Sequence, residues 1–201
     1  MKISILLPYK ENFSPEYPGA VSLFINDTSK LSKYKKYIKV YGSTKYTKKF
    51  RINYQNIDLN SRFLGSQSKA YIKKFIDFER KNPSKLIEVH NRPNYLKQLS
   101  KSLNKRNFTL FFHNDPLSME GSKSIADRNF LLKTCYRIIF NSNWSKNRFM
   151  ESIDNKFINS EKFKVCFQSA SKGNINFIPK KKKWITFVGK LNKAKGYDVF
   201  G

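Results

Sequence analysis

Two short segments carry nearly the same tetrapeptide, and each contains one of the two histidines of the protein. His90 begins "HNRP" at residues 90–93, and His113 begins "HNDP" at residues 113–116. An imidazole titrates close to neutral pH, so it can act as a general base or hydrogen-bond a substrate hydroxyl. The alternative at both positions is a structural histidine that bonds a loop carbonyl. Neither histidine belongs to a recognisable Ser–His–Asp or Cys–His set.

The residues around the two histidines are polar. Asn114 and Asp115 can hold the imidazole of His113 or cap the turn that follows. Glu88 is either a neighbour of His90 or an unusual carboxylate within a buried strand. The candidate residues in these two segments are His90, Asn91, Arg92, His113, Asn114 and Asp115.

Two further segments have the composition of an anion site. Pro18-Gly19-Ala20 begins a predicted helix after a polar loop, and a glycine there lets an anion approach the backbone N–H groups. Lys190 and Lys195 lie in "GKLNKAKG", a glycine turn that follows a predicted strand, and together they can cradle a diphosphate. A simple loop-to-helix turn and a lysine-rich surface loop are the alternatives. Neither GxGxxG nor a Walker motif is present.

The elements that must position these residues alternate along the chain. Strands are predicted at 2–8, 37–42, 136–142 and 183–190, with strand-then-loop segments at 85–93 and 108–116. Helices are predicted at 19–33, 66–81, 94–105, 122–135 and 143–153, the last with Ser142 as its N-cap. The first of these helices is expected to place Val21, Leu23, Phe24, Thr28 and Leu31 near one side.

Repeated strand–helix–strand units imply right-handed parallel crossovers. The fold class we predict is therefore α/β, a Rossmann-like, doubly wound and mostly parallel sheet with helices on both faces. In such sheets ligands bind in the crevice outside the carboxyl ends of the strands. Both histidine segments directly follow predicted strands, which places them at that edge.

The charge is strongly positive, with 40 Lys and Arg against 14 Asp and Glu and a net charge of +26. The lysines are scattered, and only "PKKKKW" at 179–184 forms a cluster. Nucleic-acid binding is therefore disfavoured relative to contact with an anionic membrane or a phosphorylated substrate. Cys135 and Cys166 lie in apolar segments without metal-ligand spacing, so we expect buried free thiols, no metal site and a cytoplasmic protein.

Together these motifs resemble a known family. "FVGKLNKAKGYDVF" at 187–200 resembles the segment that begins the C-terminal domain of family 4, GT-B-fold glycosyltransferases. "EVHNRP", "LFFHNDP" and "RIIFNSNWSKNRF" follow in the order and spacing of the N-terminal domain of that family. The resemblance covers essentially the whole chain.

The resemblance implies two Rossmann-like domains, with acceptor binding in the first and a nucleotide-sugar donor in the second. It implies transfer with retention of anomeric configuration, without a metal or other cofactor, to a cell-envelope glycan or lipid such as lipopolysaccharide. Residues 1–178 would form the acceptor-side domain, and 179–201 a linker and the start of a truncated donor-binding domain. Such an enzyme works in the cytoplasm or peripherally at the inner face of the membrane.

The resemblance also assigns roles by motif. His113 would lie at the reaction centre, and His90 and Asn91 would line the acceptor side. Gly19 would approach the donor diphosphate, which Lys190 and Lys195 would hold while they stabilise the leaving group. Arg92, Asn114 and Asp115 are assigned to the acceptor side with His90 and Asn91.

Two departures from the family pattern matter. Lys190 stands where the family usually has arginine, so the charge is kept and the bidentate fork is lost. The Glu-x7-Glu motif of the donor domain is absent from the 201 residues, so we expect this chain alone to be inactive. The alternative hypothesis is a non-catalytic module that binds a phosphorylated or membrane-linked acceptor.

Overall fold

The computed structural model describes residues 2–59, 66–154 and 161–168. Chain contacts divide the protein after Ser169, and the described residues all belong to the first unit. The predicted strand at 183–190 and the predicted domain boundary at 178 lie outside the described residues.

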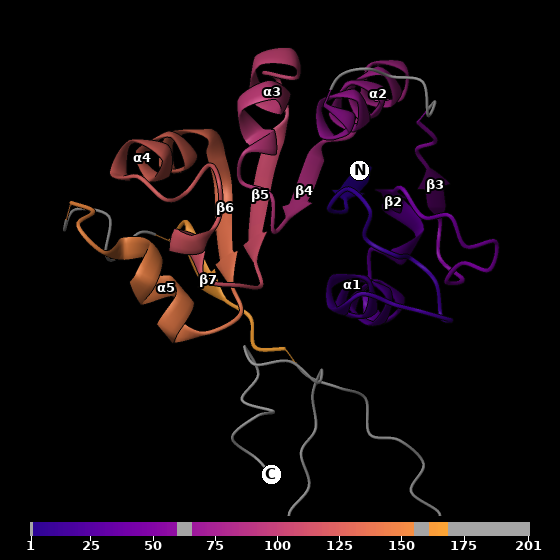
Figure 1. Ribbon diagram of the computed structural model, residues 1–201, viewed down its shortest axis with the longest axis horizontal. Coiled ribbons are helices and arrows are strands. Elements are labelled where there is room, and N and C mark those ends of the chain that lie inside the picture. The colour runs from indigo at the N-terminus through magenta and orange to yellow at the C-terminus, as the bar shows by residue number, and fades with distance from the viewer. Residues whose placement is uncertain (1, 60–65, 155–160, 169–201) are drawn as a thin grey trace, which may run out of the picture. The chain divides into compact units, whose positions relative to one another are not determined.

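The described residues form a single parallel sheet in the order β3-β2-β1-β4-β5-β6-β7 (Figure 1). The strands are β1 Ile3–Leu6, β2 Ile38–Gly42, β3 Tyr54–Asn56, β4 Leu86–His90, β5 Asn107–Phe112, β6 Cys135–Phe140 and β7 Phe163–Val165. The helices are α1 Ala20–Leu31, α2 Gln67–Lys81, α3 Tyr95–Ser102, α4 Ile125–Thr134 and α5 Asn143–Met150, with short 3-10 helices η1 Lys35–Tyr37 and η2 Pro116–Ser118. The chain builds the sheet outward from β1 in one direction and then from β4 in the other, so the topological switch point lies between β1 and β4.

Helices cover both faces of the sheet, as predicted for a doubly wound fold. Helices α2, α3 and α4 lie along one face, and α1 lies along the other (Figure 1). The larger core cluster joins α2, α3 and α4 to the central strands through side chains such as Phe75, Leu99 and Leu131. The smaller cluster packs Val21 and Ile25 of α1 against β1 and β2. The predicted α/β fold class is confirmed.

The apolar face predicted for the first helix is wrong. Val21 and Ile25 are buried, whereas Leu23 is 42% exposed and Leu31 is 85% exposed. Helix α1 instead turns small polar side chains such as Ser22 inward. Small side chains let the helix lie close to the sheet, and a pattern of apolar residues alone cannot reveal such a face.

Short strands and one cysteine also differ from expectation. Strands β3 and β7 were not predicted, because three residues are too few to show a periodic pattern. Cys135 is buried, and burial raises the pKa of its thiol to about 12. Cys166 is exposed, so the prediction of two buried thiols is wrong for this residue, which lies just beyond the edge strand β7.

The predicted helix at 143–153 is confirmed as α5, including its N-cap. The hydroxyl of Ser142 accepts a hydrogen bond of 3.1 Å from the backbone N–H of Ser145. Phe149 anchors the helix, because its fully buried ring packs 5.6 Å from Phe112 and 5.5 Å from Phe140 between ring centroids.

This packing predicts how truncation will affect stability. Phe149→Ala removes a buried ring and leaves a cavity, so we expect the free energy of unfolding to fall by about 3–5 kcal/mol. Trp144→Ala on the same helix is the control, because Trp144 is 58% exposed and its removal should cost less than about 1 kcal/mol. Urea denaturation measures both variants. Equal losses would show that α5 is not anchored through Phe149.

Candidate functional site

A pocket of about 380 Å³ opens at the carboxyl ends of β1, β4 and β5, beside the switch point. Its walls include Pro8 and Glu11 after β1, Asn91 and Arg92 after β4, and His113 and Asn114 after β5. The two histidine segments are therefore brought together at the edge of the sheet where the sequence predicted them.

The two histidines are hydrogen-bonded to each other within a longer chain of side chains. Nδ1 of His90 lies 2.8 Å from Nε2 of His113. Nε2 of His90 lies 2.6 Å from a carboxylate oxygen of Glu88, and Nδ1 of His113 lies 2.6 Å from the amide nitrogen of Gln168. We call the sequence Glu88–His90–His113–Gln168 the imidazole relay. Glu88 is thus a neighbour of His90, which was one of the two alternatives the sequence left open.

The strand geometry explains why the relay forms. Glu88 and His90 are two positions apart on β4, so their side chains leave the same face of the sheet. His90 pairs in register with Phe111 of β5, and His113 follows Phe111 by two positions.

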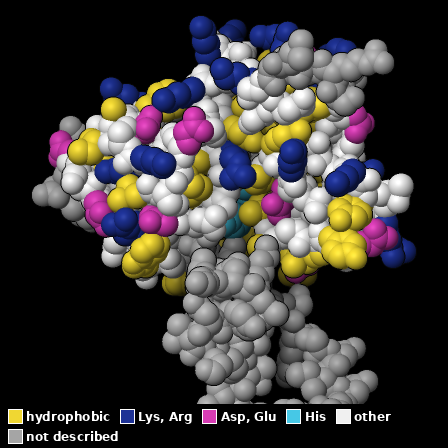
Figure 2. Space-filling view, viewed as in Figure 1, with side chains coloured by type: hydrophobic (Ala, Val, Ile, Leu, Met, Phe, Trp, Pro, Cys, Tyr) yellow, Lys and Arg dark blue, Asp and Glu magenta, His cyan; other side chains and the backbone are white. Residues whose placement is uncertain are grey.

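Aromatic rings enclose both imidazoles. The ring of Phe111 stacks against His113 at 4.5 Å and against His90 at 5.3 Å between centroids. Phe24 of α1 meets His113 edge-on at 5.1 Å. His90 is fully buried, and His113 is half-buried. Figure 2 accordingly shows only a small area of histidine side chain at the surface.

This enclosure decides the charge of His113. Burial, together with the neighbouring His90, lowers the pKa of His113 to about 3. The imidazole is therefore neutral at physiological pH, and it holds a proton poorly. Such a ring is better suited to accept a hydrogen bond from a hydroxyl than to serve as a general acid.

Hydrogen bonds between side chains and the backbone fix the loop that carries His113. Asn91 adopts a left-handed conformation with φ of 52°, and its side-chain oxygen accepts a hydrogen bond of 2.9 Å from the backbone N–H of His113. The amide of Asn141 donates to the carbonyl of His113 at 2.8 Å. The Arg92 guanidinium donates to the carbonyl of Asn91 at 2.7 Å. The loops that follow β4 and β6 thus hold the backbone of His113 from both sides.

Asp115 turns away from the imidazole. One carboxylate oxygen accepts a hydrogen bond of 3.0 Å from the backbone N–H of Leu117, which caps η2. The other lies 3.5 Å from the guanidinium of Arg148 on α5. Of the two roles that the sequence allowed, Asp115 takes the turn cap, and it is not among the side chains that line the pocket.

Gly19 lies at the N-cap of α1, and the space in front of it is already filled. A carboxylate oxygen of Glu11 accepts a hydrogen bond of 3.1 Å from the backbone N–H of Ser22, in the first turn of the helix. A β-carbon at position 19 would collide with the Glu11 carboxylate. The helix N-terminus does attract a negative group, as the sequence suggested, but in this structure the group is Glu11. The contact of Gly19 with a donor diphosphate stays a prediction.

Some functional candidates were missed, and others lie out of reach. No sequence pattern pointed to Glu11 or Gln168, because each reaches the pocket only through tertiary contacts. Lys190 and Lys195 lie outside the described residues. Within the described ranges, no group of three or more His, Cys, Asp or Glu side chains could hold a metal ion.

The fold matches solved structures, although the sequence itself matches little. No protein-family model matches the chain, and no curated protein matches it either. The structure of Anabaena HepE in complex with UDP-glucose matches with a TM-score of 0.56 and 16% identity, over 83% of this chain and 44% of that one. The apo form of the lipopolysaccharide outer core galactosyltransferase WaaB matches with a TM-score of 0.56 and 14% identity, over 92% of this chain and 50% of that one.

These comparisons establish the class of fold. The chain spans about half the length of both solved structures. Its parallel sheet with flanking helices is therefore a Rossmann-like unit of the kind that makes up half of a two-domain GT-B glycosyltransferase. At 14–16% identity the likeness shows the fold alone.

The low pKa of His113 predicts how stability depends on pH. The ordinary histidine pKa is 6.5 and the folded value is about 3, so between these values the unfolded chain binds a proton that the native protein does not. The contribution of His113 to the free energy of unfolding is therefore fully present above about pH 6.5, and it is lost as the pH is lowered toward 3. Between pH 7 and pH 5 the wild type should lose up to about 2 kcal/mol more than His113→Gln. Urea titrations of both proteins measure this difference, and parallel pH profiles would contradict the low pKa.

Proposed function

We propose that the chain forms the acceptor-side half of a retaining, nucleotide-sugar-dependent glycosyltransferase. The single observation that carries the proposal is the neutral, enclosed imidazole of His113 in the pocket at the switch point. In α/β sheets of this kind the switch point is where ligands bind. The likeness to a galactosyltransferase and to a protein solved with UDP-glucose supports the same class of substrate.

Different residues of the chain have different roles in sugar transfer. Nδ1 of His113 accepts a hydrogen bond from a sugar hydroxyl at the reaction centre. The diphosphate of the donor lies toward Gly19 and the first turn of α1, after the Glu11 carboxylate has turned aside. Lys190 and Lys195 hold the diphosphate and offset the negative charge that builds on the leaving group.

The acceptor enters from the β4 and β5 loops. Asn91 and Arg92 form one side of its site and Asn114 forms the other, whereas the buried His90 and the η2 cap Asp115 support these side chains from behind. A cell-envelope glycan or lipid is the acceptor class we propose, with lipopolysaccharide as the type named for WaaB. Residues 1–178 would serve as the acceptor-side domain, and residues 179–201 as a linker and the start of a truncated donor-binding domain.

A transfer assay tests this function. The protein translated from its complete reading frame should transfer label from a panel of UDP-sugars to envelope glycolipid, and His113→Ala should lower kcat/KM by at least about 100-fold. The control is Trp144→Ala, an exposed residue that does not line the pocket, which should keep wild-type rates. Wild-type rates in His113→Ala would remove His113 from the mechanism. The absence of transfer with every nucleotide sugar would contradict the proposal.

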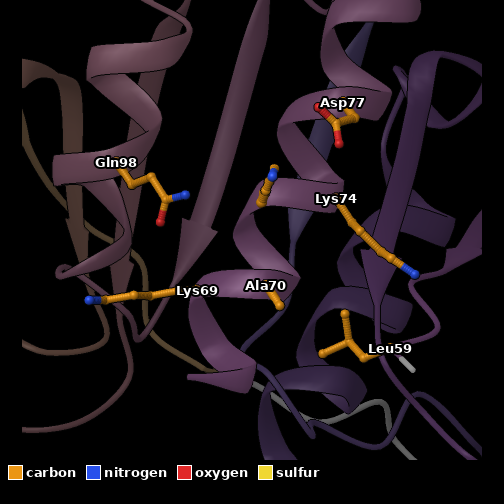
Figure 3. Close-up of a pocket in the computed structure, with 7 residues that line it drawn as sticks. Leu59, Lys69, Ala70, Lys74, Asp77 and Gln98 are labelled. Carbon is orange, nitrogen blue, oxygen red and sulfur yellow. The ribbon is translucent and has the colours of Figure 1, made fainter. Parts of the chain in front are cut away.

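A second surface suits the membrane contact that the charge suggested. A groove of about 410 Å³ lies between α2 and α3, with Leu59 and Ala70 among its lining residues (Figure 3). Lys69, Lys73 and Lys74 also line this groove from α2. Figure 2 shows Lys and Arg side chains spread over the same side of the protein, with hydrophobic side chains between them.

Three lysines on one helix beside apolar side chains are what an anionic lipid surface attracts, and they outnumber the one carboxylate of the groove, Asp77. None of the described helices is long and apolar enough to cross a bilayer. We therefore propose peripheral contact with the inner face of the membrane through this groove. If vesicles bind and no sugar is transferred, a non-catalytic module for a phosphorylated or membrane-linked acceptor becomes the better account.

Vesicle co-sedimentation tests the membrane contact. Combined Lys69→Gln, Lys73→Gln and Lys74→Gln should weaken binding to anionic phosphatidylglycerol vesicles by roughly 100-fold, because each lysine contributes about 1 kcal/mol. The matched control changes Lys30, Lys35 and Lys36 to Gln, because these lysines line a separate pocket beside η1 and their loss removes the same charge. Equal loss in both triple variants would show a non-specific charge effect. Equal binding to neutral and anionic vesicles would contradict the proposed contact.

A further inference from the structure

We propose that Glu88 and His90 are positioning residues that hold His113 in a single tautomer, with its proton on Nε2. Nδ1 of His113 is then a permanent hydrogen-bond acceptor that faces the pocket. The inference deepens the proposed function, and it rests on that function for the identity of the ligand, a sugar hydroxyl. Three steps along the imidazole relay lead to it.

The first step starts at Glu88. A carboxylate can only accept hydrogen bonds, so the contact of 2.6 Å requires a proton on Nε2 of His90. The side chain of Glu88 is 23% exposed, which lets water solvate its charge. Glu88 is thus the acceptor at this end of the relay.

The second step concerns His90. Its side chain has no exposed surface, and its ring stacks on Phe111 at an angle of 12°. The direction follows from the pocket end, where the amide nitrogen of Gln168 can only donate, so Nδ1 of His113 accepts and the one proton of the neutral His113 ring is on Nε2. Nε2 of His113 therefore donates to Nδ1 of His90 at 2.8 Å, and Nε2 of His90 donates to Glu88.

The third step reaches the pocket. His113 is neutral, and its proton is used toward His90, so Nδ1 carries a lone pair. The amide nitrogen of Gln168 lies 2.6 Å from Nδ1 and donates to it. Both His113 and Gln168 line the pocket. The N–H of Gln168 therefore makes the hydrogen bond to Nδ1 that the O–H of a bound ligand would make.

The consequence is a rule of specificity. A lone pair fixed at this position favours a ligand group that carries a hydrogen, such as a sugar hydroxyl, and disfavours a phosphate oxygen, which can only accept. The diphosphate must then lie elsewhere in the site. A relay of opposite direction would reverse the preference, because Nδ1 of His113 would carry a proton and donate.

Nitrogen NMR distinguishes the two directions. The chain has only two histidines, so ring labelling with 15N-histidine gives few signals, and His90→Gln and His113→Gln assign them. At neutral pH we expect Nε2 of both rings to be protonated and Nδ1 of both rings to show the shift of an unprotonated nitrogen. A scalar coupling across the hydrogen bond should join Nδ1 of His90 to the protonated Nε2 of His113. A proton on Nδ1 of His113 would overturn the proposal.

Variants at Glu88 test the positioning role. In Glu88→Gln the side-chain oxygen can still accept from His90, so the wild-type tautomers should remain. In Glu88→Ala the direction is no longer fixed, so His113 should show a mixture of tautomers, with intermediate shifts for its two ring nitrogens. Asp77→Ala removes an exposed carboxylate from α2 as the control and should change nothing. Unchanged tautomers in Glu88→Ala would mean that Glu88 does not position His113.

These spectra need neither substrate nor turnover. They are recorded on the 201-residue chain itself, so the relay can be confirmed even if the transfer assay fails. Conversely, transfer with a reversed or mixed tautomer at His113 would support the proposed function and overturn this inference. Should Glu88→Ala fail to fold, the wild-type spectrum and Glu88→Gln still decide the direction of the relay.

Discussion

The burial of two imidazoles beside one carboxylate is the constraint on which the site depends. His90 has no contact with water, so its hydrogen bonds must be made within the protein, by Glu88 on one side and His113 on the other. Phe111 stacks against both rings, and burial together with His90 lowers the pKa of His113. The edge of the sheet therefore carries a rigid, neutral hydrogen-bond acceptor. A flexible charged side chain would be more common on the surface of a basic protein.

The sequence predicted a large part of this arrangement because parallel sheets obey simple rules. Apolar runs followed by "HNRP" and "HNDP" indicated that both histidines lie at the carboxyl edge, and adjacent strands then bring them together. The sequence left Glu88 as either a neighbour of His90 or an unusual carboxylate in a buried strand, and the structure decides for the neighbour. What could not be predicted comes from tertiary contacts. Glu11 reaches α1 from a loop, and small polar residues turn inward on that helix, contrary to its apolar pattern.

Glu11 also makes one side of the pocket negatively charged. Its carboxylate caps α1 beside Gly19, so negative charge is already present where a donor diphosphate would approach. A diphosphate at this helix must displace Glu11 or be compensated by further cations, and the family resemblance supplies Lys190 and Lys195 for that purpose. In the function we propose, His113 meets the other requirement, because a neutral acceptor binds hydroxyls without attracting phosphate. In the proposed site the sugar and the diphosphate are thus recognised by different groups.

The most direct measurement is a crystal structure of the protein soaked with UDP-glucose at high concentration. The account predicts a sugar hydroxyl within hydrogen-bond distance of Nδ1 of His113, with the amide of Gln168 displaced from its present contact. It also predicts that the diphosphate lies on the α1 side of the pocket, with Glu11 turned away from the backbone of Ser22. Diphosphate bound directly to His113, or a sugar bound away from this pocket, would contradict the central claim.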